Sequence, residues 1–226
     1  MSSGADTILT LVRHGHTEWN GLGRYQGLAP VPLSERGRLQ AEHLAQALAP
    51  GDPMGDPVSR PIQAIYSSDL LRCRQTAAPI AAALGLPVQF DPRLREADYG
   101  HWQGLTREEA ARWDPEAYAA YRADPDGVAI PGGESHQMLA NRVLAALADV
   151  LARHGGEHVL LVTHGGPLRA ILEHYDLWQG GHPPGNASRT VIAVSPAGRA
   201  EVLLMGDVAH LPAALQPDRS GTTFIA

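Results

Sequence analysis

The sequence contains no lysine, because all 18 of its basic residues are arginines. This absence excludes catalysis by a lysine Schiff base, a phosphate-loop lysine and the lysine that protein kinases require. Any cationic side chain that takes part in chemistry here is therefore an arginine or a histidine.

Cysteine is almost as scarce, with Cys73 as the one example among 226 residues. A lone thiol forms neither an internal disulfide nor a multi-cysteine metal site, so the sequence has no sign of an oxidising compartment. The first residues lack the basic and apolar regions of a secretion signal, and no apolar run is long enough to cross a membrane. We expect a cytoplasmic protein with no membrane partner.

The chain also lacks a basic run and has a formal net charge of −6. This acidic balance argues against nucleic acid or a membrane surface as the main ligand, although positive charge can still gather in one pocket. Apolar residues make up 44% of the chain, which is ample for a substantial core. We expect a single domain covering residues 1–226.

Apolar runs of strand length alternate with amphipathic stretches of helical length. The predicted strands cover residues 9–12, 64–68, 87–90, 158–163, 190–195 and 200–205. The predicted helices begin at or just after Ser34, Ser68 or Asp69, Thr106, Asp114, Ser135 and Pro167. This order predicts the α/β class, as a three-layer α/β/α sandwich with a mostly parallel central sheet.

Three segments fall outside that alternation. The two short helices between about residues 105 and 130 suggest a small helical lid inserted over the site. Residues 51–61 are rich in proline and glycine and predict a surface connection, whereas the tail after Gly206 has no clear assignment.

Two of the predicted strands end in a histidine. The first runs into Arg13-His14-Gly15, and the most apolar strand of the chain runs into His164-Gly165-Gly166. Ligands of mostly parallel sheets bind beyond the carboxyl ends of the strands, so both histidines are expected at that edge. Arg13 offers planar donors suited to a phosphoryl group, which suggests phosphate chemistry with His14 as nucleophile. Taken singly, each histidine also fits a turn or core position.

Seven motifs, in order, resemble those of the histidine phosphatase superfamily, which includes cofactor-dependent phosphoglycerate mutases and small acid phosphatases. The motifs are Arg13-His14-Gly15-x-Thr17-x-Trp19-Asn20, Gly23-Arg24-x-Gln26-Gly27, Pro32-Leu33-Ser34, Ser68-Asp69-Leu70-x-Arg72-x-x-Gln75-Thr76-Ala77, Leu94-x-Glu96-x-x-x-Gly100-x-Trp102, Pro131-Gly132-Gly133-Glu134-Ser135 and Val162-Thr163-His164-Gly165-Gly166. The resemblance covers nearly the whole chain.

The resemblance implies a role for each matching residue. His14 would attack phosphorus and become a phosphohistidine, while Arg13, Arg72 and His164 surround the transferring group. Glu96 would be the general acid and later the base, with Asp98 as its alternative. The implied substrate-binding residues are Asn20, Arg24, Gln26, Gly27, Tyr99 and Gly165. No metal or other cofactor is expected, since the arginines would take the place of a metal.

Departures from the mutase branch favour hydrolysis. Ala97 stands where mutases have an arginine for the substrate carboxylate, and the paired arginines and proline-rich insertion of mutases are missing between Arg112 and Pro125. We therefore expect a metal-independent phosphomonoester hydrolase acting on a small-molecule phosphate monoester. A phosphoglycerate mutase and a non-catalytic phosphate-ester-binding protein are the alternatives. The oligomeric state is left open, with a homodimer among the arrangements.

Aromatic residues gather in the segment that follows Glu96. They are Tyr99, Trp102, Trp113, Tyr118 and Tyr121. Such residues fit the mouth of a pocket that tolerates apolar groups, and they fit a core equally well. Gln103 and Pro30 depart from the family pattern, and both departures concern the shape of the substrate pocket.

Overall fold

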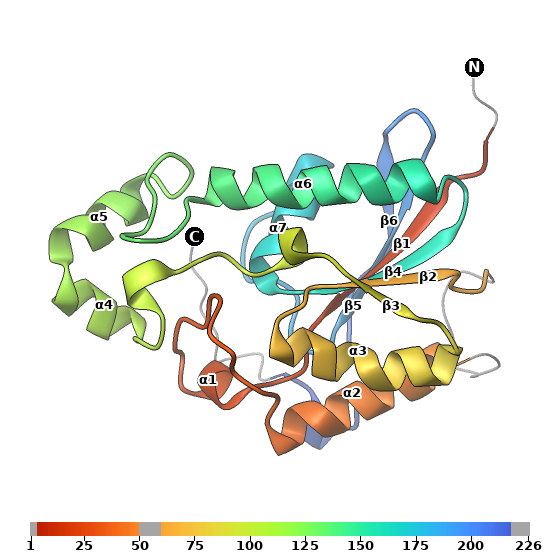
Figure 1. The fold of residues 1–226 in the computed structure, drawn as a ribbon, viewed down its shortest axis with the longest axis horizontal. Coiled ribbons are helices and arrows are strands. Elements are labelled where there is room, and N and C mark those ends of the chain that lie inside the picture. Colours follow the sequence, from red (N-terminus) through yellow and green to blue (C-terminus); the bar gives the residue numbers. More distant parts are fainter. Residues whose placement is uncertain (1–3, 50–59, 218–226) are drawn as a thin grey trace.

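The middle layer of the protein is a six-stranded sheet with the order β3-β2-β4-β1-β5-β6 (Figure 1). The structure, a computed structural model, describes residues 4–49 and 60–217. The strands are β1 Thr7–Arg13, β2 Ala64–Ser67, β3 Val88–Phe90, β4 His158–Thr163, β5 Arg189–Val194 and β6 Ala200–Asp207. Strands β1 to β4 pair in parallel, and β5 is antiparallel to both of its neighbours.

Helices cover both faces of this sheet (Figure 1). They are α1 Glu18–Gly21, α2 Glu35–Leu48, α3 Leu71–Leu84, α4 Arg107–Trp113, α5 Pro115–Ala123, α6 His136–Arg153 and α7 Gly165–His174, and short 3-10 turns cover Pro92–Leu94, Gly100–Trp102 and Ala213–Leu215. Helices α2 and α3 pack on one face, and α6 and α7 on the other. The predicted three-layer fold with a mostly parallel sheet is confirmed. No helix within the described ranges is long and apolar enough to span a membrane.

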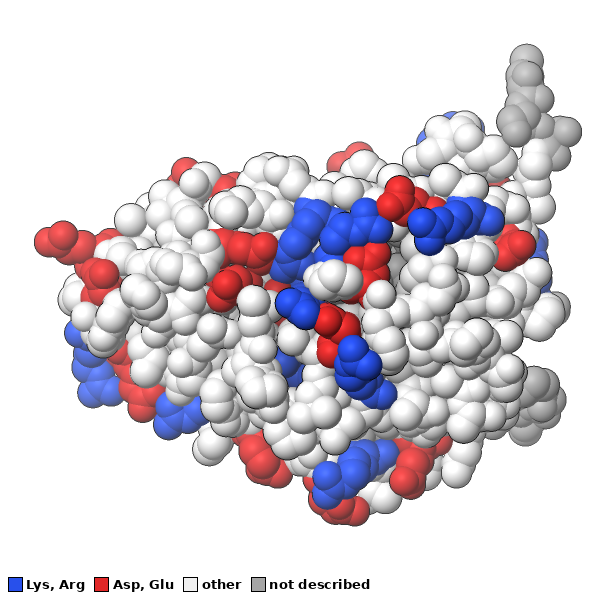
Figure 2. All heavy atoms as spheres, viewed as in Figure 1, with Lys and Arg blue, Asp and Glu red and all other residues white. Residues whose placement is uncertain are grey.

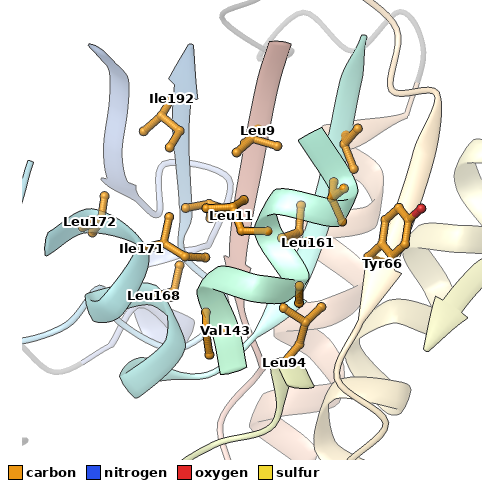
Figure 3. Packing of buried hydrophobic residues seen from close by; sticks show 14 of the residues in the cluster. Leu9, Leu11, Tyr66, Leu94, Val143, Leu161, Leu168, Ile171, Leu172 and Ile192 are labelled. Atoms are coloured by element: carbon orange, nitrogen blue, oxygen red, sulfur yellow. The ribbon is translucent and has the colours of Figure 1, made fainter. Parts of the chain in front are cut away.

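The two central strands are buried along their whole length. Successive side chains of a strand point to opposite faces, so a strand covered on both sides needs apolar residues at nearly every position. Leu9 and Leu11 of β1 pack with α6 and α7 (Figure 3), whereas Val12 packs with α2 and α3. Each fully buried leucine contributes about 1.5–3 kcal/mol, which explains the unbroken apolar runs in the sequence.

The register between β1 and β4 places the two strand ends side by side. Arg13 lies opposite Thr163 in this parallel pair, so the next residues, His14 and His164, leave the sheet together. The fold thus brings together two histidines that are 150 positions apart in the sequence.

Two predicted helix starts are wrong. Helix α3 begins at Leu71 after an N-cap, Leu70, that makes no side-chain cap hydrogen bond. The expected caps are used elsewhere, because the Ser68 hydroxyl bonds to His164 and the Asp69 carboxylate binds Arg95. Helix α7 begins at Gly165, two residues before Pro167.

The sequence also singled out a connection at residues 51–61 and a tail after Gly206. The connection at residues 51–61 lies largely outside the described residues. Beyond Gly206, strand β6 ends at Asp207 and the 3-10 turn Ala213–Leu215 packs near α2.

Helices α4 and α5 lie at the opposite end of the molecule from the amino terminus (Figure 1). They surround a separate apolar cluster of Trp102, Ala110 and Ile130, with Tyr118 and Tyr121 packed against it. This region therefore has a small core of its own. Its function as a lid, and the single-domain organisation of residues 1–226, stay predictions.

Candidate active site

His14 and His164 are neighbours at the carboxyl ends of β1 and β4. Their ring centroids are 5.1 Å apart, and the residues are 2% and 0% exposed. The Nδ1 atom of His14 lies 2.8 Å from the carbonyl oxygen of Gly15. A carbonyl oxygen only accepts, so this hydrogen bond requires the proton on Nδ1 and leaves the lone pair on Nε2. A nucleophilic attack by His14 would therefore use Nε2.

The loop after β1 is packed too closely for larger residues. The Gly15 amide donates to the hydroxyl of Thr76 on α3, at 3.0 Å. A Cβ on Gly15 would come within 2.6 Å of the Gly37 carbonyl oxygen at the start of α2. Glycine at position 15 thus lets the loop carrying His14 rest directly on α2 and α3.

Both histidines are held in their neutral form. Burial lowers the pKa of His14 well below its usual range, and Arg72 and Arg13 lower it further. The pKa of His164 is lowered in the same way, by burial first and then by Arg72 and His14. A neutral His14 has a lone pair without prior deprotonation, and a neutral His164 still has one N–H to donate.

Two side chains contact the ring of His164. Its Nε2 atom is 2.8 Å from the hydroxyl of Ser68 and 3.3 Å from Sγ of Cys73. Burial raises the pKa of the Cys73 thiol to about 12, so the thiol stays protonated. The single cysteine is therefore an unreactive side chain beside His164.

Arg72 is a completely buried cation. Its Nη2 and Nη1 atoms donate to the carbonyl oxygens of Gly27 and Ala29, at 2.8 and 3.2 Å. Within the described part of the chain its Nε atom has no hydrogen-bond partner and no carboxylate binds it. A buried cation is costly unless it is paired, so this side chain is suited to receive an anion.

Arg13 lies beside the same site. Its Nη1 atom donates to the carbonyl oxygen of Pro184 at 2.8 Å, and its guanidinium lowers the pKa of both histidines. Burial in turn lowers the pKa of Arg13 itself, and Glu96 opposes that change. The strand ends and α3 thus gather two guanidinium groups around a pair of neutral rings.

Glu96 lies at the amino terminus of α7. Its Oε1 atom accepts from the backbone amide of Gly166 at 3.1 Å and from that of Ala97 at 3.0 Å. A Cβ on Gly166 would lie 2.4 Å from Oε1 of Glu96 and 2.8 Å from Cδ2 of Leu139, so glycine leaves room for the carboxylate in this position. Glu96, Arg13, Gly165 and Tyr99 line one cleft.

The position of Glu96 depends on Arg142 and Glu134. Arg142 of α6 donates to the carbonyl oxygens of Arg93, Arg95 and Glu96, each within 2.8 Å. The same guanidinium binds both carboxylate oxygens of Glu134 at 2.8 Å. The sequence analysis assigned neither residue a role; the available signal was an arginine between Leu139 and Val143 on a largely apolar helix.

Further ion pairs fasten the chain just before Glu96. Arg95 binds Asp69, and Arg93 binds Asp91 and Asp149. Figure 2 shows basic and acidic side chains interleaved across the middle of this face, between α6 and α3 in the view of Figure 1. Surface pairs contribute little each, at about 0–1 kcal/mol, but several acting on one segment restrict its movement.

Several other predicted binding residues are not in the cleft lining. Asn20 accepts through Oδ1 from Thr17 in the capping box of α1, and Arg24 bonds to Gly104 and Glu109. The carbonyl of Gly27 supports Arg72, and Gln26 is buried. His14, Arg72 and His164 also lie outside the lining, because they are buried more deeply than Arg13 and Glu96.

The aromatic residues occupy three kinds of position. Tyr99 and Tyr121 line the cleft, whereas Trp102 is completely buried in the cluster between α4 and α5. Trp113 is 54% exposed and touches the edge of His101. Trp102 is therefore a core residue, and the alternative of a mouth residue is wrong for it.

Residues 4–49 and 60–217 contain no group of three or more histidine, cysteine, aspartate or glutamate side chains placed to hold a metal ion. In the motif His14-x-His16, Nδ1 of His14 is 2.8 Å from the Gly15 carbonyl oxygen and Nδ1 of His16 is 2.8 Å from the hydroxyl of Ser34. The cations around the site are arginines.

A family model for the histidine phosphatase superfamily (branch 1) matches residues 9–207. The chain belongs to this superfamily. The match includes both strand-end histidines, Arg72 and Glu96, and it confirms the resemblance seen in the sequence.

Known relatives of this histidine phosphatase carry both phosphatase and mutase names. The metal-independent phosphoserine phosphatase of Arabidopsis thaliana is 43% identical over 167 residues, covering 73% of this chain and 67% of that protein. Phosphoglycerate mutase-like protein 4 of the same plant is 36% identical over 212 residues, covering 90% and 86%. The solved mycobacterial glucosyl-3-phosphoglycerate phosphatase with VO3 is 34% identical, with a TM-score of 0.75 over 89% of this chain and 99% of that one.

The family match and the similarity to known phosphatases together identify the chain as a phosphomonoester hydrolase of the phosphohistidine type. The predicted enzyme class is thereby confirmed.

Proposed function

We propose that this phosphatase uses Nε2 of His14 to attack the phosphorus of a small-molecule phosphate monoester. The observation that carries the proposal is the hydrogen bond from Nδ1 of His14 to the Gly15 carbonyl, in a buried site next to Arg72. The bond from Nε2 to phosphorus forms as the ester P–O bond breaks, which leaves a phosphohistidine and a leaving oxygen.

Glu96 is proposed to move the protons. Its carboxyl group gives a proton to the leaving oxygen, and the resulting carboxylate then takes a proton from the attacking water. Water breaks the P–N bond, which releases inorganic phosphate and restores neutral His14. The place of Glu96 in the cleft lining, next to Gly165 and Gly166, supports its role in proton transfer.

Arg13, Arg72 and His164 are proposed to stabilise the charge that spreads over the phosphoryl oxygens. Two guanidinium groups and one N–H donor in a buried site supply this without reorganisation, and losing one such donor typically costs about 10²–10³-fold in rate. Tyr99 and Gly165 would contact the substrate from the cleft lining, and Gly27 would act through Arg72. Asn20, Arg24 and Gln26 stay predicted binding residues.

Transfer between two positions of a phosphoglycerate is the second candidate. The relative named phosphoglycerate mutase-like protein 4 favours it. Ala97 favours hydrolysis, because its methyl group provides no cation for a carboxylate at the position where mutases have an arginine. Incubation with 3-phosphoglycerate separates the two, since a hydrolase releases phosphate faster than it forms 2-phosphoglycerate.

Hydrolysis of p-nitrophenyl phosphate in excess chelator tests the proposed chemistry. We expect turnover by the unaltered enzyme and its loss in His14→Ala. His174→Ala, which changes an exposed histidine at the end of α7, serves as the control and should retain activity. Activity in His14→Ala, or activity lost in chelator alone, would rule out this mechanism.

Two further predictions concern the location of the protein in the cell and its oligomeric state. A lone buried thiol, Cys73, supports a cytoplasmic location. The homodimer stays a prediction, and sedimentation equilibrium of the full chain decides between monomer and dimer.

A further inference from the structure

The loop between α7 and β5 lies against the backbone of His14. The side-chain Nδ2 atom of Asn186 in this loop donates to the carbonyl oxygen of His14 at 3.0 Å. The next backbone amide, that of Ala187, donates to the carbonyl oxygens of Arg13 and His14 at 3.0 and 3.2 Å. Two consecutive residues of the loop therefore hold the backbone of the residue whose ring is proposed to attack phosphorus.

The side chain of Asn186 also reaches the carbonyl group that fixes the tautomer of His14. Its Nδ2 atom lies 3.5 Å from the Gly15 oxygen, which is the same oxygen that accepts from Nδ1 of His14 at 2.8 Å. Which ring nitrogen of a histidine bears the proton is set by the hydrogen bond that the other nitrogen or its own N–H makes. The direction of the Gly15 carbonyl therefore decides whether Nε2 keeps its lone pair.

Asn186 and Ala187 are both buried, and one of them has an unfavourable backbone conformation. The two residues are 8% and 0% exposed. Ala187 has a φ of 54°, in the left-handed region that residues other than glycine rarely adopt. Such conformations persist only where the surrounding structure holds them, and they cluster at functional sites. Here the strained residue is the one whose amide binds the carbonyl of His14.

We infer that Asn186 is a positioning residue, which holds the carbonyls of His14 and Gly15 in place and so keeps the proton of His14 on Nδ1. This rests on the proposed function, in which Nε2 of His14 attacks phosphorus. Asn186 lies outside the cleft lining and acts through His14. Without its amide group the Gly15 carbonyl is free to turn, and the proton can move to Nε2, the position that free histidine favours. The lone pair needed for the attack is then lost from Nε2.

Asn186→Leu tests the inference, because leucine has a similar shape and no hydrogen-bond donor. With p-nitrophenyl phosphate, the burst of nitrophenol reports the transfer of the phosphoryl group to His14. We expect the burst rate to fall by about 10–100-fold, the loss that corresponds to one or two buried hydrogen bonds. The substrate concentration that gives half of the maximal burst rate should change little. A thermal melt checks folding, and Asn186→Ala takes the place of the leucine variant if that variant does not fold.

Nitrogen-15 NMR of enzyme with labelled histidine rings observes the proton of His14 directly at neutral pH. The signals of His14 are those that His14→Ala lacks. The unaltered enzyme should show a protonated Nδ1 and an unprotonated Nε2, and Asn186→Leu should show the proton at least partly on Nε2. A role in stability alone would lower the melting temperature and leave both the tautomer and the burst rate unchanged.

Ser188→Ala is the matched control. Ser188 lies in the same loop and is 1% exposed, and its hydroxyl has no hydrogen-bond partner among the residues that the structure describes. The control should keep the tautomer and the burst rate. The inference is overturned by an unchanged tautomer and burst rate in the folded Asn186 variant, or by a proton on Nε2 of His14 in the unaltered enzyme. An unaltered enzyme that forms no phosphohistidine at His14 would instead count against the proposed function.

Discussion

The floor and the mouth of the active site are built in different ways. The floor, defined as Arg13, His14, Arg72 and His164, lies at strand ends and on α3, and all four residues are buried. The mouth, defined as Tyr99, Arg107, Tyr121, Arg122 and Arg169, comes from helices α4, α5 and α7 and from the residue before a 3-10 turn, and it is half-buried. The floor is thus fixed by the sheet, whereas the mouth depends on local packing.

This difference separates the reaction from the choice of substrate. Moving His14 or His164 would require a change in the register of β1 and β4, on which the main cores also depend. Apart from Arg169 on α7, the mouth rests on or beside the separate cluster around Trp102, so its side chains can change while the floor stays in place. The chemistry should therefore withstand changes at the mouth, and the substrate preference should not.

The largest effect is expected from the core of the mouth. Trp102→Ala removes a completely buried indole, and such truncations cost about 3–5 kcal/mol. Urea unfolding monitored by circular dichroism measures the loss. Trp113→Ala, at a site that is 54% exposed, is the control and should change stability by less than about 0.5 kcal/mol. Equal losses in the two variants would contradict the separate core.

A change in the floor should affect the catalytic rate more than substrate binding. Arg72→Gln removes a buried cation next to both histidines, and we expect kcat to fall by about 10²–10³-fold with p-nitrophenyl phosphate. Arg74→Gln changes an exposed arginine on the same helix and is the matched control. Equal kinetics in the two variants would remove Arg72 from the floor.

A smaller effect concerns stability in acid. The folded pKa values of His14 and His164 lie well below the ordinary value of 6.5, so the unfolded chain binds more protons below that pH. Their contribution is complete above pH 6.5 and is lost as the pH falls towards the folded values. Unfolding free energy should therefore fall between about pH 7 and pH 5, and by less in His164→Asn. A mouth variant, Tyr121→Phe, should keep the original slope, and an unchanged slope in His164→Asn would contradict the assignment.

The floor could be anticipated from the sequence because strand ends and motifs are local patterns. The apolar run before Arg13-His14 and the one before His164 each indicate a strand, and parallel strands bring their ends together. The motif around Arg72 predicts that this side chain belongs to the site. The start of α3 did not follow, since Ser68 and Asp69 look like helix caps and are used by residues that are distant in sequence.

The mouth could be anticipated only in part: the sequence indicated Tyr99 and Tyr121 as possible mouth residues, but not the packing around them. Trp102 and Trp113 are both tryptophans in a mixed polar segment, and only packing shows that one is core and the other exposed. Arg142 reaches carbonyl oxygens 46 to 49 positions earlier in the chain. Contacts of that range depend on the finished fold, and no spacing rule reveals them.

Trapping the phosphoenzyme tests the central claim most directly. Glu96→Gln is mixed with p-nitrophenyl phosphate, whose good leaving group needs little acid assistance, and the reaction is quenched in alkali, where phosphohistidine survives. Without the proposed base, water attack should be slow, so a burst of nitrophenol and a phosphoryl group on the peptide containing His14 are predicted. A phosphoryl group on another residue, or a nitrophenol burst with none on His14, would contradict the account.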